Sequence, residues 1–141
     1  MISFRATRTS LSVAAALGLT SALIRTLGLR RAARVAWWVA DRMPAPRPSP
    51  LAPAEIAAGW AHTIARVADD MPVVPRCLPR ALLLALLLRR RGIGADLCLG
   101  ARIGADFDAH AWIEIDGAPV NEAADLESAY RRLWRLPTVA R

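Results

Sequence analysis

The sequence has no lysine and only two cysteines, Cys77 and Cys98, and these shortages exclude several classes of protein. All 19 basic residues are arginine, which we attribute to codon usage rather than to selection for phosphate binding. Two cysteines do not provide the pairing pattern of a secreted disulfide scaffold. A reducing cytoplasm is therefore the expected compartment, and a disulfide between the two cysteines is not expected.

Motifs for nucleic acid, nucleotides and structural zinc are also missing. The chain has no zinc-finger spacing, no helix-turn-helix signature and no interleaving of aromatic and basic residues, so nucleic acid is not an expected partner. It has no glycine loop that could cradle phosphates, and we expect no cofactor. A zinc site is not expected either, because no structural zinc spacing is formed by Cys77, Cys98, His62 and His110.

What the chain does contain is apolar residues, which make up 55% of its 141 positions and suffice for the core of one compact domain. The charge is unevenly distributed. Residues 1–53 contain eight arginines and one acid, whereas residues 54–141 contain eleven arginines and eleven acids, so the whole net charge of +7 lies in the N-terminal part. A basic segment of this kind could meet anionic lipid, nucleic acid or an acidic partner.

Residues 9–24 form an uncharged apolar stretch that follows two arginines, as the core of a signal peptide does. Further arginines follow without an A-x-A cleavage pattern, and the 16 residues are fewer than the ~20 needed to cross a bilayer. We therefore predict helices over 9–28 and 30–42 that pack on the protein or a partner, or lie on a membrane surface. They make up a predicted N-terminal extension, residues 1–43.

Five of the ten prolines lie in residues 44–53, which predicts an extended, semi-rigid linker. Residues 54–141 then form the predicted main domain. Its periodicity predicts helices over 54–68, 77–92 and 124–135, and strands over 96–102, 109–115 and 118–122. The predicted class is α+β, with a central apolar helix that begins at a cysteine and packs on an antiparallel sheet.

Cys77 is the candidate nucleophile, because it begins the predicted central helix. Unpaired backbone N–H groups and the positive end of the helix dipole favour a thiolate at this position. Arg76 and Arg80 add positive potential beside it. A cysteine nucleophile needs its pKa lowered in this way, since a free thiol is mostly protonated near neutral pH.

His110 is the candidate general base. In its predicted strand it alternates with core aliphatic residues and shares a face with Trp112, which could wall a substrate groove or pack in the core. A three-residue turn at 115–117 would place His110 opposite Glu122, whose carboxylate could then orient the imidazole. A two-residue turn would instead place these two side chains on opposite faces of the sheet.

CLPR (77–80) opens the apolar helix, and it is followed by RRRGIGADLCLGAR (89–102) and FDAHAWIEIDGAPVNE (107–122). Together these segments resemble the leader peptidases of lasso-peptide biosynthesis, a family with a transglutaminase-like, papain-like fold. The resemblance covers roughly residues 54–122. It implies that Cys77 is the nucleophile and His110 the base.

The acid of the site departs from the pattern of that family. The family usually places Asp twelve residues after the histidine, where this chain has Glu122, which is one methylene longer. Asp108 and Asp125 are the alternative acids. The expected triad is therefore Cys77, His110 and Glu122, with the backbone N–H of the cysteine as the oxyanion donor.

The resemblance also implies an activity and partners. Members of the family remove the leader from a ribosomally made precursor peptide, and the peptidase is often a chain separate from the protein that grips the leader. We expect this split form here, since no winged-helix-like recognition domain fits before residue 54. The implied partners are the precursor peptide, a leader-recognition protein and an ATP-dependent macrolactam cyclase. Residues 1–43 could dock on one of them or on a membrane.

Two other functions stay open from the sequence. A non-catalytic adaptor of the same fold would bind peptide or membrane and would not need the Cys77 thiol. An acyltransferase would use the same Cys77 and His110, with an amine in place of water as the acceptor.

Overall fold

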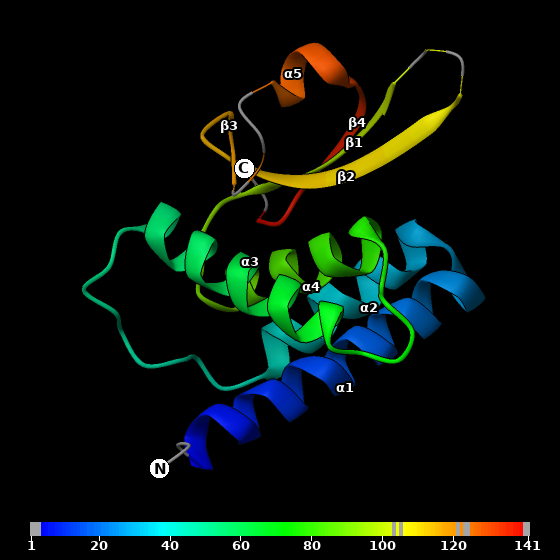
Figure 1. Cartoon of the computed structure of the whole chain (residues 1–141). Coiled ribbons are helices and arrows are strands. Elements are labelled where there is room, and N and C mark those ends of the chain that lie inside the picture. Colours follow the sequence, from blue (N-terminus) through cyan, green and yellow to red (C-terminus); the bar gives the residue numbers. More distant parts are fainter. Residues whose placement is uncertain (1–3, 103, 105, 121, 123–124, 140–141) are drawn as a thin grey trace.

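The computed structural model of the chain describes residues 4–102, 104, 106–120, 122 and 125–139. Four long helices form one layer, which lies against one face of a four-stranded antiparallel sheet (Figure 1). A fifth, short helix lies over the opposite face of the sheet. This arrangement confirms the predicted α+β class and the central helix packed on an antiparallel sheet.

The first four helices form close to where the sequence predicts them. Gly28, with a φ of 75°, separates the first two, and a proline begins the third. The helices are α1 (Phe4–Leu27), α2 (Leu29–Arg42), α3 (Pro53–Asp69), α4 (Cys77–Arg90) and the short α5 (Leu126–Ala129).

The central helix α4 is apolar on nearly every side, and the structure surrounds it accordingly. Helices α1, α2 and α3 contact α4 on one side, and strand β2 (Asp108–Ile115) contacts it on the other. One hydrophobic core therefore extends from Val13 in α1, through Leu82 and Leu88 in α4, to Ile113 in the sheet. The predicted division into an extension and a main domain stays a prediction, but residues from both parts share this core.

Helix α1 packs on the core through one side only. Val13, Leu17 and Thr20 are buried, whereas most of its other described side chains are at least partly exposed. Within the described part of the chain, one helical stretch, Arg8–Leu27, is long and apolar enough to cross a membrane. Core helices of other proteins and signal sequences share this length and composition.

The sheet has the strand order β3-β2-β1-β4, with antiparallel neighbours throughout. As predicted, β2 alternates between two environments. Ala111 and Ile113 face the helical layer, whereas Trp112 packs with Cys98 and Leu126 on the other face. The other strands are β1 (Asp96–Arg102), β3 (Ala118–Pro119) and β4 (Arg131–Pro137).

The predicted last helix over 124–135 is wrong. The chain forms only the short α5 and then pairs with β1 as strand β4, with Leu97 opposite Leu136. Without β4, this edge of β1 would present a row of unsatisfied backbone groups beside the core. Long-range pairing of this kind overrides the local helix preference of the segment.

The predicted three-residue turn between β2 and β3 is also wrong. Glu114 pairs with Pro119, so the loop has two residues, Asp116 and Gly117. Both have positive φ angles, 51° and 79°, which are typical of the tight turn whose twist matches that of a hairpin. Asp116 thus adopts the left-handed conformation that the prediction assigned to glycine alone.

The return strand is shorter than the predicted 118–122. Strand β3 ends at Pro119, after which the Val120 N–H donates one more hydrogen bond to the Ile113 carbonyl, at 2.8 Å. Glu122 lies beyond the paired residues. Its position relative to β2 is therefore not set by the strand register that the turn imposes.

Gly100 in β1 lies where the two strands beside it come close. A Cβ atom at this position would lie 2.7 Å from Cη2 of Trp112 and 2.9 Å from the carbonyl oxygen of Arg131. Both distances are shorter than real Cβ contacts, and the second neighbour is backbone. The indole of Trp112 can therefore occupy its place only because residue 100 has no side chain.

We expect Gly100→Ala to lower the free energy of unfolding by about 1–3 kcal/mol, because the added methyl group must displace the indole or the β4 backbone. Urea denaturation measures the change. Gly94→Ala is the matched control, since no atom lies within 4 Å of a Cβ built there. Equal stability of the two variants would contradict the close packing described for Trp112.

Candidate active site

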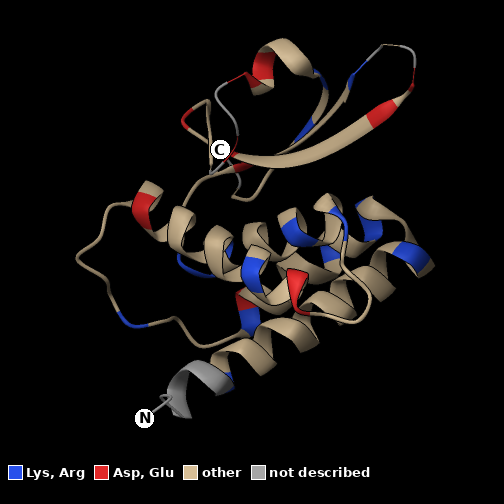
Figure 2. Ribbon diagram, in the orientation of Figure 1, with Lys and Arg blue, Asp and Glu red and all other residues tan. Residues whose placement is uncertain are grey.

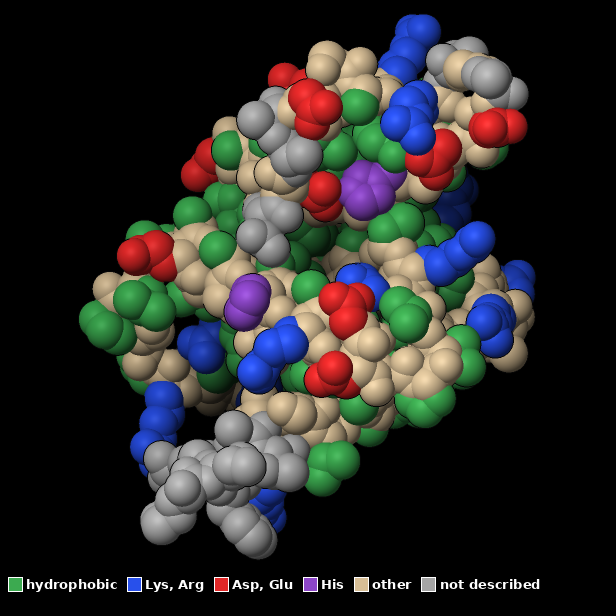
Figure 3. All heavy atoms as spheres, in the orientation of Figure 1, with side chains coloured by type: hydrophobic (Ala, Val, Ile, Leu, Met, Phe, Trp, Pro, Cys, Tyr) green, Lys and Arg blue, Asp and Glu red, His purple; other side chains and the backbone are tan. Residues whose placement is uncertain are grey.

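A cleft of about 380 Å³ opens between the helical layer and the sheet. Figure 3 shows a hollow between the two layers, with histidine and acidic side chains beside it. Helices α3 and α4 form one wall and β2 the other. The polar groups of the cleft are contributed mainly by Arg76, Cys77, Arg80, His110 and Glu122.

Cys77 is the first residue of α4, and its half-buried thiol meets β2 at the cleft. The sulfur interacts with the imidazole of His110 and with the backbone N–H groups of Ala111 and Leu78. The N–H of Ala111 can turn toward the sulfur because β3 pairs only with the end of β2, at Glu114 and Ile115. The structure thus brings the start of the central helix to the edge of the sheet.

His110 joins the thiol to a carboxylate. Its Nε2 atom lies 3.1 Å from both carboxylate oxygens of Glu122, which leaves Nδ1 for the thiol of Cys77. The side chains of His110 and Glu122 are 25% and 23% exposed, so both are largely shielded from water. Glu122 reaches the imidazole although the predicted register is wrong, since it lies beyond the end of β3.

These contacts shift both titrating groups toward their charged forms. The hydrogen bond with Cys77, followed by that with Glu122, raises the pKa of His110 from 6.5 to about 10. The hydrogen bond with His110 lowers the pKa of the Cys77 thiol from 9.0, and burial opposes this effect only in part. Both shifts favour the thiolate–imidazolium form of the pair, which is the form that a cysteine nucleophile needs.

Two aromatic rings enclose the imidazole of His110. Trp112 stacks on it with ring centroids 5.9 Å apart, and Tyr130 lies against it at 5.2 Å. The Tyr130 hydroxyl donates a hydrogen bond of 2.6 Å to Asp108, which holds the phenol in place. Sequence analysis missed Tyr130, although it is the only tyrosine of the chain, because it was assigned to a helix.

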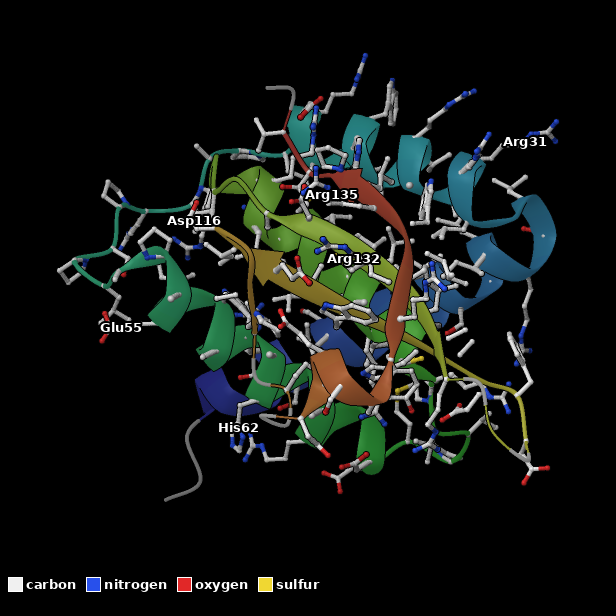
Figure 4. The ribbon with its side chains drawn as sticks, turned by 90° about the horizontal axis from the view of Figure 1, so that it is seen from above. Arg31, Glu55, His62, Asp116, Arg132 and Arg135 are labelled. Carbon is white, nitrogen blue, oxygen red and sulfur yellow. The ribbon has the colours of Figure 1, made fainter. Side chains whose placement is uncertain are left out.

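Trp112 combines the two roles that sequence analysis left open: it lines the cleft, yet it is only 4% exposed. Its indole N–H donates to the buried carboxylate of Glu114 at 2.9 Å, and Arg132 donates to the same carboxylate at 2.7 Å. Figure 4 shows Arg132 on β4, over the sheet. This network fixes the ring that supports His110, and its arginine lies on the strand that the sequence did not predict.

The other candidate residues lie apart from this arrangement. Asp108 is engaged by a tyrosine and an arginine, and Asp125 is exposed at the start of α5. His62 is exposed on α3, at the margin of the molecule (Figure 4). Cys98 is fully buried, and burial raises the pKa of its thiol to about 12. Of the acids considered, Glu122 is thus the one in contact with His110.

No metal cluster is found in the described part of the chain, where no three His, Cys, Asp or Glu side chains gather closely enough to hold an ion. The cleft instead contains a thiol, an imidazole and a carboxylate in series. This order of groups is the one used in nucleophilic catalysis by cysteine. The catalytic role of each residue stays a prediction that the experiments below address.

Comparison with protein families gives a match over most of the chain. The model of a family described as the transglutaminase-like superfamily matches residues 19–135. The match begins within α1 and ends within β4, so it includes Cys77, His110 and Glu122. Searches of curated proteins and of solved structures found no match.

We expect iodoacetamide to alkylate Cys77 at pH values below 9.0, because its hydrogen bond with His110 lowers the thiol pKa. Above the lowered pKa the thiolate is populated, and the rate falls as pH drops through it. His110→Ala should move this rise in rate to higher pH. Cys98 is the internal control, since its pKa of about 12 keeps it protonated and unmodified. An unchanged pH profile in the variant would contradict the pairing.

Glu122→Gln should lower the pKa of His110 from about 10, because the carboxylate both accepts its hydrogen bond and stabilises its positive charge. Titration of the imidazole signals by NMR measures the shift. Glu127→Gln, which removes an exposed glutamate of α5, is the matched control. If the His110 imidazole had the same pKa in both variants, Glu122 would not be its partner.

Proposed function

The chain belongs to the transglutaminase-like superfamily, and from this premise we propose that it is a cysteine peptidase. The superfamily consists generally of cysteine peptidases and transglutaminases. The proposed substrate is a ribosomally made lasso-peptide precursor, from which the enzyme removes the leader. The observation that carries the proposal is the imidazole of His110, which contacts the thiol of Cys77 and the carboxylate of Glu122 within one cleft.

The shape of the cleft is compatible with a peptide substrate. Its walls combine apolar side chains of α3 and α4 with the edge of β2. In the described residues β3 pairs only with the end of that strand, so the backbone before Ile113 lies at an edge of the sheet, where the Ala111 N–H meets the Cys77 sulfur and the other groups are not paired with β3. An extended peptide can bind along such an edge through main-chain hydrogen bonds. The choice of a lasso precursor rests on the sequence resemblance of residues 77–80, 89–102 and 107–122.

In the first half of the proposed reaction the Cys77 thiolate attacks the carbonyl carbon at the junction of leader and core. A C–S bond forms, and the carbonyl oxygen becomes an oxyanion. Leu78 already donates its N–H to the sulfur, and Pro79 has none, so the N–H of Cys77 is the first-turn donor left for the oxyanion. As the C–N bond breaks, the imidazolium of His110 protonates the leaving amine and a thioester remains.

In the second half water replaces the amine. His110, now neutral, accepts a proton from water while the oxygen attacks the thioester carbonyl. The C–S bond breaks, the leader leaves as a carboxylic acid, and the thiolate–imidazolium pair is restored. Glu122 holds the ring through Nε2 during both proton transfers, so that Nδ1 stays directed at the cleft.

The proposal includes partners. A separate leader-recognition protein would present the precursor, and an ATP-dependent macrolactam cyclase would close the ring of the released core. The nucleotide chemistry would belong to the cyclase. Within this scheme the present chain supplies the thiol, the imidazole and the carboxylate, with no cofactor.

The proposal predicts that the chain, incubated with precursor peptide and recognition protein, yields two products whose summed mass exceeds that of the precursor by one water. Mass spectrometry detects them. Cys77→Ala should lower the rate at least about 1,000-fold, because the nucleophile is lost. Cys98→Ala is the matched control and should cleave at a rate near that of the unchanged chain.

The same experiment separates the two alternatives. With an added primary amine, an acyltransferase would give a leader–amine adduct in place of the free acid. A non-catalytic adaptor would support the pathway equally well with Cys77→Ala. Cleavage that persists undiminished in that variant rules out the proposed peptidase.

A further inference from the structure

One face of α1 carries apolar side chains that stay open to solvent. Leu11 and Leu19 are 67% and 66% exposed. Ala15, Gly18 and Ala22 are exposed as well, and their spacing places them with the two leucines on one side of the helix. We refer to these five residues as the α1 face. Helix α1 lies on the side of the helical layer away from the sheet (Figure 1).

An apolar groove of about 700 Å³ lies beside the α1 face. It is bounded by α1 and α2, and side chains of α4 form its floor. Leu19 belongs both to the groove and to the α1 face, and Met43, across the groove, is 40% exposed. The groove and the α1 face therefore form one continuous apolar surface. Contiguous exposed surface of this kind marks a site of interaction.

Arginines stand at both ends of this surface. Arg8 and Arg25 are exposed, and the residues between them are uncharged. At the rise of an α-helix they lie roughly 25 Å apart. Arg90 of α4 also lines the groove. Figure 2 shows further basic residues along α2, among which Arg31 points outward (Figure 4).

The one acid of the N-terminal part is already compensated. Asp41, the one acid among residues 1–53, forms a two-point ion pair with Arg89, at 2.8 and 2.9 Å. The hydrogen bond from Arg89 lowers the pKa of the Asp41 carboxyl, so that it stays ionised and paired. Glu55 of α3 lies near Thr9 of α1, but the eight arginines of residues 1–53 outnumber the acids beside α1, so the potential there is positive, which suits an anionic partner.

We propose that the α1 face docks on an anionic lipid bilayer, with α1 lying in the plane of the interface. An apolar helix face with flanking arginines is the arrangement that binds such surfaces. A helix of a partner protein could fill the groove, but it would leave Leu11, Ala15 and Ala22 exposed. A bilayer surface covers the α1 face and the rim of the groove together.

The packing of α1 in the hydrophobic core indicates that this helix lies on the bilayer and does not cross it. Val13 and Leu17 are buried against the rest of the fold, at 5% and 0% exposure. If α1 crossed the membrane as a separate helix, these side chains would leave the core, and the apolar side of α4 would meet water. Docking through the α1 face keeps α1 in place. It also leaves the cleft at Cys77, between the helices and the sheet, accessible from solution.

Flotation with lipid vesicles tests this proposal on the full chain. We expect it to float with phosphatidylglycerol/phosphatidylcholine vesicles at low salt, and to bind much less at 1 M salt or with phosphatidylcholine alone. Leu11→Ser with Leu19→Ser should weaken partitioning at least about tenfold. Leu133→Ser is the matched control, because Leu133 on β4 is 66% exposed like Leu19 but lies on the sheet.

Arg8→Gln with Arg25→Gln should weaken binding to the anionic vesicles at least about fivefold and leave binding to neutral vesicles unchanged. Circular dichroism shows whether each variant is folded. Four results would overturn the proposal. They are a folded chain that binds neither vesicle, salt-independent binding to neutral vesicles, equal losses in the Leu133→Ser control, and resistance to alkaline carbonate extraction, which would indicate a membrane-spanning helix.

Discussion

The start of α4 meets the edge of β2, and the chemistry of the cleft depends on this contact. The Cys77 sulfur receives the N–H of Ala111 because β3 leaves this part of β2 at the sheet edge. The same short β3 leaves Glu122 outside the strand register and within reach of His110. One local feature, a return strand of only two paired residues, thus accounts both for the backbone N–H that helps to lower the Cys77 pKa and for the contact of Glu122 with the imidazole.

A hydrogen-bond network on the face of the sheet away from the helices holds the ring that packs on His110. Glu114 is buried and takes part in hydrogen bonds with Trp112 and Arg132, and the indole in turn stacks on His110. A buried carboxylate with two donors is costly to disturb, since either donor lost would leave a charge without compensation. Gly100 provides the space that the indole occupies. The imidazole of His110 is therefore held by the Trp112 ring on one side and by the Glu122 carboxylate on the other.

Local signals in the sequence sufficed for α3, α4, β1 and β2, whose periodicity and end residues agree with their structure. They did not suffice for β4, because its pairing with β1 is set by distant residues and its own pattern also fits a helix. The turn was wrong because Asp116 adopts a positive φ, which the sequence does not reveal. The predicted side chains Cys77, His110 and Glu122 do meet in the cleft, but Tyr130 and Arg132 depended on the strand that the sequence did not predict and on its connection.

Helix α4 links the two ends of the molecule. Its first residue carries the thiol, and its buried side chains pack against α1. Removing α1 would therefore expose leucines of α4 to water. It would also destabilise the helix that positions the Cys77 sulfur, although the described residues of α1 do not line the cleft. For protein engineering, the N-terminal helix is therefore part of the structural support of the cleft, and a tag or fusion partner is better attached where it leaves α1 packed on α4.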